Sequence, residues 1–205
     1  MGYRRAGFEV VGVDIVDQPN YPFEFLRRDA LAWLAAPGYV ERAFAAVHAS
    51  PPCQFATAYK RRKGVAVGAV NLIPATRRLL RATGLPYVIE NVEQAREHLI
   101  DPVRYCGSSF GLDVQRHRRF ESSFGLVAPP CDHGWQTPRF PPATNRTNLR
   151  NTVEVGVYRI PLATQQAAMG IDWMTLPELS QAIPPAYTEH VGSQLLEHLD
   201  AGVAA

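Results

Sequence analysis

The string Pro86-Tyr87-Val88-Ile89-Glu90-Asn91-Val92 combines an apolar run with a charged side chain that follows it. The run does not alternate with polar residues, which is typical of a strand buried on both faces of a sheet. Further strands are expected at 9–15 and 45–49, with helical patterns between the strands. This alternation predicts a parallel α/β sheet, whose ligands bind beyond the carboxyl ends of the strands. Asp14, Cys53 and Glu90 fall at such ends.

Residues 69–83 carry apolar side chains at helical spacing and are followed by Gly84, which is typical of a helix end. At 126–151 the composition changes to Pro, Thr, Asn and Arg with little periodicity, which indicates a long loop or a small irregular insertion. Three further helices are expected at 165–169, 176–183 and 187–199. The predicted organisation is therefore a core at 1–125, a short insertion at 126–160, and C-terminal helices at 161–205 that complete the core.

The composition fits one globular domain. The chain has 205 residues, of which 46% are hydrophobic. This length and hydrophobic content are enough to bury a continuous core. The formal net charge is +2. No apolar run approaches the roughly 20 residues of a membrane span, and the first residues lack a secretory signal pattern. We therefore expect an intracellular protein. Because the net charge is small, nucleic-acid binding would depend on local basic clusters.

The three cysteines are Cys53, Cys106 and Cys131, without any CxxC pair. An odd number in this arrangement suggests neither a disulfide framework nor a structural zinc site. Cys131 is followed closely by His133, but adjacent ligands without a second pair rarely close a tetrahedral site. We therefore expect no metal, and interpret Cys106 and Cys131 as structural thiols.

Cys53 lies in the string Ser50-Pro51-Pro52-Cys53-Gln54. A single cysteine is usually a small core hydrophobe. Here the two prolines fix two φ angles and remove two amide donors, which suits a rigid exposed loop after a strand better than a packed interior. Since a thiolate is a strong nucleophile, this loop is suited to present Cys53 for covalent chemistry.

Glu90 is the complementary group. A carboxylate at a strand end can simply face water or pair with an arginine. A carboxyl group in a confined pocket, kept partly protonated, can instead hydrogen-bond a ring nitrogen and an exocyclic amine, and can stabilise a covalent adduct by proton transfer. A thiol nucleophile together with such a carboxyl group indicates chemistry on a pyrimidine, and cytosine fits best.

The ordered set of PPCQ at 51–54, ENV at 90–92 and Arg116-His117-Arg118-Arg119-Phe120 resembles the motif series of the DNA cytosine-5 methyltransferases. The similarity extends from Ala6 to Pro185 and is greatest to short, phage-type members. The resemblance implies a class I, Rossmann-like methyltransferase sheet with helices on both faces. It also implies S-adenosylmethionine as the methyl donor, a cytosine flipped out of duplex DNA, and a target-recognition role for 126–160.

The same resemblance implies the catalytic roles. Cys53 would add to carbon 6 of the ring, Glu90 would hold the cytosine edge, and Arg116 and Arg118 would form the Arg-x-Arg motif, one near phosphate and the other beside the flipped base. Forked, charged donors suit both tasks; an ordinary solvated basic face is the alternative. Among the substrate-contacting group, Asn91 is expected to brace the Pro-Cys loop rather than touch the base.

The donor site implied by the resemblance consists of Asp14 at the ribose hydroxyls, Asp29 at the adenine amine, and Pro52. Aspartates at such places are often only caps or turn residues. Pro52 and Gln54 belong to the loop that would close over the DNA.

Two basic segments are candidates for contacts with DNA. The run at 59–63 would meet the phosphate backbone beside the flipped base, with a solvated loop as the alternative. The insertion could read base edges or form a phosphate-binding loop, and the latter interpretation is preferred. The candidate residues are Lys60, Arg61, Arg62, Arg139, Asn145, Arg146, Asn148 and Arg150.

The chain departs from the family pattern at its start. The glycine-rich first motif and its strand are missing, and residues 1–7 resemble the helix that follows them. In this fold that strand lies mid-sheet. We therefore expect the natural protein to start upstream; an eroded copy or a rearranged sheet are the alternatives. In addition, Val114 stands where the family has a glutamine before the Arg-x-Arg pair, and Gln115 follows one residue later. Ser180-Gln181 stand in place of the family's closing Gly-Asn.

The expected function is methylation of cytosine carbon 5 in double-stranded DNA, by a monomer in the cytoplasm of a bacterium or of a phage-infected cell. Restriction-modification, phage self-protection and regulation are alternative roles. A transfer-RNA methyltransferase of the same motif family is the second hypothesis. The third is an inactive DNA-binding remnant that lacks donor binding.

Overall fold

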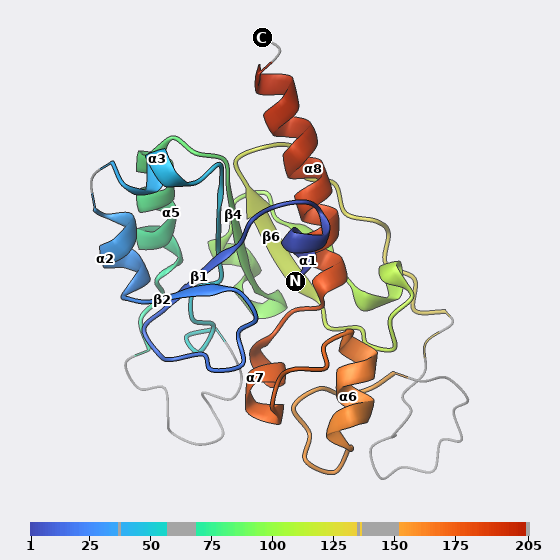
Figure 1. Cartoon of the computed structure of the whole chain (residues 1–205). Helices are drawn as coiled ribbons and strands as arrows, with labels where there is room; N and C mark the ends of the chain where they lie inside the picture. Colours follow the sequence, from blue (N-terminus) through green and yellow to red (C-terminus); the bar gives the residue numbers. More distant parts are fainter. Residues whose placement is uncertain (37, 57–68, 135, 137–151, 204–205) are drawn as a thin grey trace. The chain divides into compact units, whose positions relative to one another are not determined.

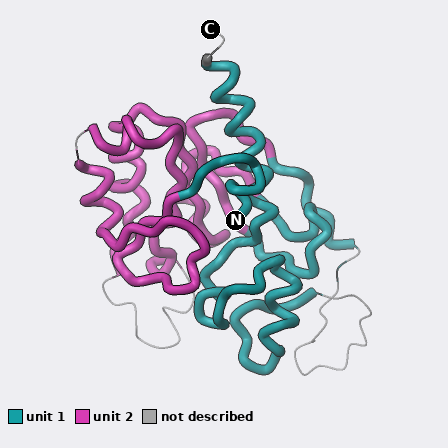
Figure 2. The backbone as a smooth tube through the Cα atoms, in the orientation of Figure 1, with its two compact units in different colours: residues 1–10, 105–117, 128–205 teal, residues 11–104, 118–127 magenta. Residues whose placement is uncertain are grey.

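The computed structural model describes residues 1–36, 38–56, 69–134, 136 and 152–203 (Figure 1). These residues form two compact units (Figure 2). Unit 1 contains residues 1–10, 105–117 and 128–205, and unit 2 contains residues 11–104 and 118–127. The predicted core at 1–125 therefore contributes chain to both units. Among the described residues, no helix has both the length and the apolar character of a membrane span.

Unit 2 is built on a sheet with the strand order β3-β4-β6-β5. β3 (Val47–Ala49) runs parallel to β4 (Tyr87–Val92), and β6 (Arg118–Ser122) runs antiparallel to β4. The prediction of a parallel sheet is therefore wrong for β6, and the sheet is mixed. Between β4 and β6 the chain forms the 3-10 turns η1 (Glu93–His98) and η2 (Gly107–Phe110) and the short edge strand β5 (Val103–Tyr105). Antiparallel neighbours need no crossover helix.

A second, separate sheet in unit 2 contains only β1 (Val11–Asp14) and β2 (Glu24–Arg27), which pair in parallel. The strands of the described chain thus form two sheets, where the sequence predicted one. β1 lies within the expected strand at 9–15. The sequence missed β2, since its four residues carry a charge at each end and only two apolar side chains, too short a pattern to read as a strand.

Among the described residues of unit 2, the α-helices are α2 (Ala30–Leu34), α3 (Val40–Ala43) and α5 (Ile73–Thr83), which lie together on one side of β4 (Figure 1). α5 confirms the predicted helix but begins four residues later than expected. It ends at Gly84, whose φ of 70° is in the left-handed region that favours glycine. The core beneath the helices is apolar; it includes Leu34, Val40, Ile73, Leu80 and Ile89.

A buried ion pair joins α5 to β6. Arg77 donates from Nε and Nη2 to the two carboxylate oxygens of Glu121, with both distances 2.6 Å, and also from Nη2 to the carbonyl of His98 at 2.7 Å. The Glu121 carboxylate accepts a further bond from the backbone N–H of Ile100 at 2.9 Å. The hydrogen bond to Glu121 is the main cause that raises the pKa of Arg77. The charge of Arg77 is therefore paired inside unit 2 rather than exposed to solvent.

The described part of unit 1 contains η2, four α-helices and the loops between them. α1 (Gly2–Arg5) packs on the long C-terminal helix α8 (Pro185–Val203), and a Cβ at Gly2 would lie 2.1 Å from the carbonyl oxygen of Pro185. α6 (Leu162–Met169) and α7 (Leu176–Gln181) complete the unit. All three helices predicted for the C-terminal part are confirmed. Their core includes Val114, Ile160, Met169, Ile171 and Leu179.

The pair between Arg77 and Glu121 leads to a stability prediction. Replacing Arg77 with alanine leaves a buried carboxylate without its counter-charge, so we expect Arg77→Ala to lower the free energy of unfolding by about 3 to 5 kcal/mol. Urea unfolding followed by circular dichroism measures this loss. Arg78→Ala on the exposed face of the same helix is the matched control, with an expected change within about 0.5 kcal/mol. Equal losses in the two variants would contradict the importance of the pair.

Candidate active site

The Pro-Pro-Cys loop follows β3 directly and is attached to β4. The side-chain amide of Asn91 donates from Nδ2 to the carbonyl oxygen of Pro51 at 2.8 Å, which is the bracing contact expected of Asn91. A turn follows, in which the N–H of Ala56 donates to the carbonyl of Cys53 at 2.9 Å. Cys53 is partly exposed and forms no disulfide with the other described cysteines. The loop is therefore held to β4 through the backbone carbonyl of Pro51. The Cys53 thiol lies at the start of the turn that ends at Ala56.

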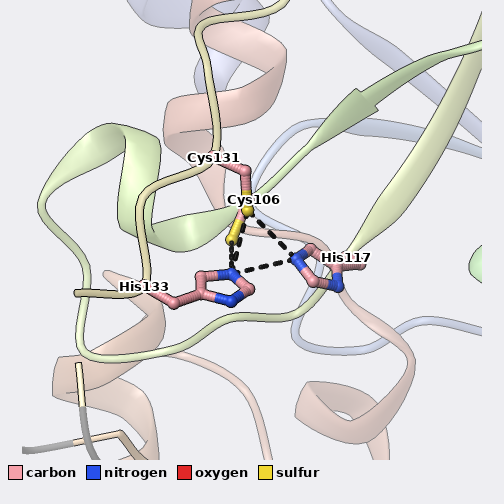
Figure 3. Close-up of side chains that lie close together, drawn as sticks. All are labelled: Cys106, His117, Cys131 and His133. Atoms are coloured by element: carbon pink, nitrogen blue, oxygen red, sulfur yellow. Dashed lines mark hydrogen bonds between the residues drawn. The ribbon is translucent and has the colours of Figure 1, made fainter.

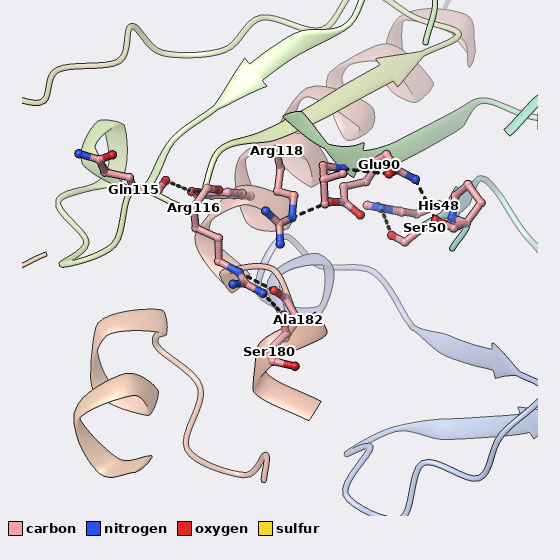
Figure 4. Close-up of polar contacts among 12 residues, drawn as sticks. His48, Ser50, Glu90, Gln115, Arg116, Arg118, Ser180 and Ala182 are labelled. Carbon is pink, nitrogen blue, oxygen red and sulfur yellow. Dashed lines mark hydrogen bonds and ion pairs between the residues drawn. The ribbon is translucent and has the colours of Figure 1, made fainter. Parts of the chain in front are cut away.

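Glu90 lies inside β4 rather than at the strand end, because β4 continues to Val92. Its carboxylate is buried and forms an ion pair with Arg118, with 3.1 Å between Oε1 and Nε (Figure 4). The strand register explains this contact. Glu90 is paired with Phe120, so Arg118 is the diagonal neighbour of Glu90 on the same face of the sheet. The two motifs that contribute these residues are thus joined by the antiparallel pairing.

The basic run before Phe120 is not a solvated face. Arg119 points to the opposite side of β6 from Arg118 and forms a bidentate pair with Glu93, with distances of 2.9 and 2.5 Å. The side chains of Arg118 and Arg119 are only 14% and 13% exposed. Both guanidinium groups are therefore engaged with carboxylates of unit 2.

Arg116 belongs to unit 1 and contacts the end of α7. Its guanidinium donates to the carbonyl oxygens of Ala182 at 2.8 Å, Ser180 at 2.7 Å and Leu179 at 3.3 Å (Figure 4). The last carbonyl groups of a helix lack partners within the helix, and a positive charge there is favourable. Arg116 also has a φ of 38°, a strained value for a residue other than glycine. Its described contacts are those of a helix cap, and its role at DNA stays a prediction.

His48, which the sequence analysis did not select, lies on β3 just before the loop. Its Nε2 is 3.3 Å from the hydroxyl oxygen of Ser50, and its ring meets the ring of Phe120 edge to face (Figure 4). Burial lowers the pKa of His48 to about 4, so the imidazole is neutral at neutral pH. The only signal in the sequence was a histidine within the apolar run at 45–49.

The two aspartates expected at the methyl donor, Asp14 and Asp29, both accept hydrogen bonds from backbone N–H groups. Asp14 ends β1 as predicted, and its carboxylate accepts from the N–H of Val16 at 2.9 Å and from Nε2 of Gln18 at 3.3 Å. Asp29 is the N-cap of α2 and accepts from the N–H of Ala32 at 2.8 Å. The contacts of Asp29 are thus those of a helix N-cap, which was the alternative to a role at the donor. A carboxylate has about four acceptor positions, so these bonds leave room for ribose hydroxyls at Asp14.

Pro52 and Gln54 are exposed on the loop after β3. The remaining predicted residues for contacts with DNA, in the segments 57–68 and 137–151, lie outside the described residues. They are Lys60, Arg61, Arg62, Arg139, Asn145, Arg146, Asn148 and Arg150.

Comparison with models of known protein families and with curated proteins finds no match.

The contacts of Arg116 predict a structural penalty. We expect Arg116→Ala to reduce the free energy of unfolding by about 2 kcal/mol, because three carbonyl groups lose a charged donor. Urea unfolding measures the change. Arg159→Ala, which removes an exposed arginine of the same unit, is the control and should cost less than about 1 kcal/mol. Arg116→Lys should recover only part of the loss, since lysine lacks the forked donors. A wild-type stability in Arg116→Ala would refute the capping role.

His48 predicts a dependence of stability on pH. In the unfolded chain its pKa returns to about 6.5, so the unfolded state binds the proton first, and His48 destabilises the fold as the pH falls from about 6.5 to about 4. From pH 7 to pH 5 this contribution is at most about 2 kcal/mol. Unfolding of the wild type and of His48→Gln at both pH values measures it, because the other groups titrate in both proteins. Identical pH dependence in the two proteins would exclude a buried neutral His48.

Proposed function

We propose that this chain is a DNA cytosine-5 methyltransferase that uses S-adenosylmethionine. The observation that carries the proposal is that three segments far apart in the sequence meet at β4. Asn91 of β4 holds the Pro-Pro-Cys loop through Pro51, and Glu90 of β4 is paired with Arg118 of β6. The Cys53 loop, the Glu90 strand and the Arg118 strand are therefore parts of one network in unit 2, as the motif series of that family requires.

The residues of this network suit the chemistry. The Cys53 thiolate would form a bond to carbon 6 of cytosine, which makes carbon 5 nucleophilic enough to take the methyl group of the donor's sulfonium. A base would then remove the proton from carbon 5, and the bond between sulfur and carbon 6 would break to restore the thiolate. Glu90 would hydrogen-bond the cytosine edge, and Arg118 would orient the Glu90 carboxylate from the same face of the sheet.

The described strands of unit 2 place Asp14 at the carboxyl end of β1, in the two-stranded sheet, and Glu90 in the four-stranded sheet. The carboxyl ends of strands are where ligands of such folds bind, so Asp14 would be available for the ribose hydroxyls of the donor.

The decisive experiment is a denaturing gel. The protein is mixed with S-adenosylmethionine and duplex DNA that contains 5-fluorocytosine, whose fluorine blocks the final elimination. We expect a covalent complex of protein and DNA that depends on the donor and is absent in Cys53→Ala. Glu90→Gln should slow its formation by on the order of 100-fold, because the cytosine edge loses its proton donor.

Two further arms separate the alternatives. Transfer RNA that contains 5-fluorocytosine, in competition with duplex DNA, tests the second hypothesis, and a complex formed preferentially with RNA would favour it. Binding of labelled S-adenosylmethionine tests the third. Retention of DNA without binding of the donor, by a chain that circular dichroism shows to be folded, would identify a DNA-binding protein and contradict methyl transfer.

A further inference from the structure

Four side chains that can bind metal converge in unit 1: Cys106, His117, Cys131 and His133 (Figure 3). Their ligand atoms all lie within 4.8 Å of one another. The sequence analysis expected no metal because Cys131 and His133 lack a second pair nearby in the chain. The fold supplies that pair from Cys106 and His117, which lie 25 positions before Cys131 and 16 positions before His133. The chain folds back after η2, where the N–H of Gly107 donates to the carbonyl of Gln115, and this turn brings Cys106 and His117 together.

We propose that these four residues bind one zinc ion in a closed, structural site. The Nε2 atom of His133 lies 3.2 Å from Sγ of Cys106, 2.9 Å from Sγ of Cys131 and 3.2 Å from Nε2 of His117. Sγ of Cys131 and Nε2 of His117 are 3.4 Å apart. Zinc bonds of about 2.3 Å to sulfur and about 2.0 Å to nitrogen give tetrahedral edges of about 3.3 to 3.8 Å. The cluster needs only small shifts to reach this geometry.

The chemistry of the ligands selects the metal and its role. Two thiolates and two imidazoles form the Cys₂His₂ set of structural zinc sites, whereas magnesium and calcium require oxygen ligands. Four protein ligands fill a tetrahedral shell and leave no position for a water molecule or a substrate. The ion would therefore stabilise the fold rather than take part in a reaction.

The surroundings hold the ligands in place. The hydroxyl group of Ser108 donates to Sγ of Cys106 at 3.1 Å, as expected of a group that supports a metal-bound thiolate. Ser109 donates from its hydroxyl to the carbonyl of Pro130 at 2.9 Å, just before Cys131. After His133, the amide of Gln136 donates to the carbonyls of Leu112 and Val114 at 2.8 and 3.1 Å. The segment that carries Cys131 and His133 is thus attached on both sides.

The site does not depend on the proposed methyltransferase function, but it would affect the same motif. His117 lies between Arg116 and Arg118, so a metal bond at His117 would fix the backbone from which both arginines project. Cys131 and His133 would also anchor the chain immediately before the segment 137–151. Zinc would in this way connect the residues before η2, the segment at His117 and the segment at 131–133.

Metal analysis tests the proposal. The full chain is purified without chelators, and zinc is measured by inductively coupled plasma mass spectrometry. We expect one zinc per chain, and less than a tenth of that in Cys106→Ser and in His133→Ala. Cys53→Ser and the exposed His198→Ala are the matched controls and should retain the full zinc content.

Measurements on the wild-type protein keep the test valid if the variants fail to fold. X-ray absorption at the zinc edge should show two sulfur and two nitrogen ligands, and cobalt substitution should give the intense visible bands of tetrahedral thiolate coordination. A folded wild type that neither contains zinc nor binds added zinc or cobalt stoichiometrically would overturn the proposal. Thiol titration of Cys53→Ser after denaturation without a reductant distinguishes a disulfide: two thiols support the zinc site, and no thiol would show that Cys106 and Cys131 are joined.

Discussion

The antiparallel pairing of β4 with β6 is the constraint on which the candidate site depends. Because side chains alternate along β6, one face of the strand presents Arg118 to Glu90 and Phe120 to His48, and the other presents Arg119 to Glu93 and Glu121 to Arg77. A shift of the register by one residue would exchange the two faces and separate every one of these pairs. The register therefore determines both the candidate catalytic carboxylate and the buried ion pair that joins the sheet to α5.

Three arginine–glutamate pairs join the sheet of unit 2 to α5 and η1 and join β4 to β6. The pairs of Arg77 with Glu121 and of Arg118 with Glu90 are largely buried, so removal of one partner there leaves an uncompensated charge. Such pairs contribute little net stability compared with apolar packing, but they allow few alternative arrangements. For Glu90 this is an advantage in the proposed reaction, because an oriented carboxylate need not reorganise when the base arrives.

Much of the fold could be predicted from the sequence, and the failures have physical causes. Long periodic segments such as α5 and α8 were predicted because packing on one face leaves a clear pattern. The mixed sheet was missed because no strand was expected at β6, whose five residues RRFES include three charged side chains. Among the site residues, the bracing contact of Asn91 was expected. The helix-capping contacts of Arg116 were not, since they join positions more than 60 residues apart.

The cysteine and histidine cluster shows the same limit of local patterns in a sharper form. Spacing rules recognise metal sites in which two ligands come from one turn, and here only Cys131 and His133 are close in sequence. The other two ligands flank η2, and they become neighbours of the pair only when the loop from Gly107 closes on the backbone of Gln115, whose carbonyl accepts from the Gly107 N–H at 2.7 Å. A Cβ at Gly107 would lie 2.0 Å from the carbonyl oxygen of Val114, so only glycine permits this approach. The residue that decides whether four ligands can meet is therefore a glycine that binds nothing itself.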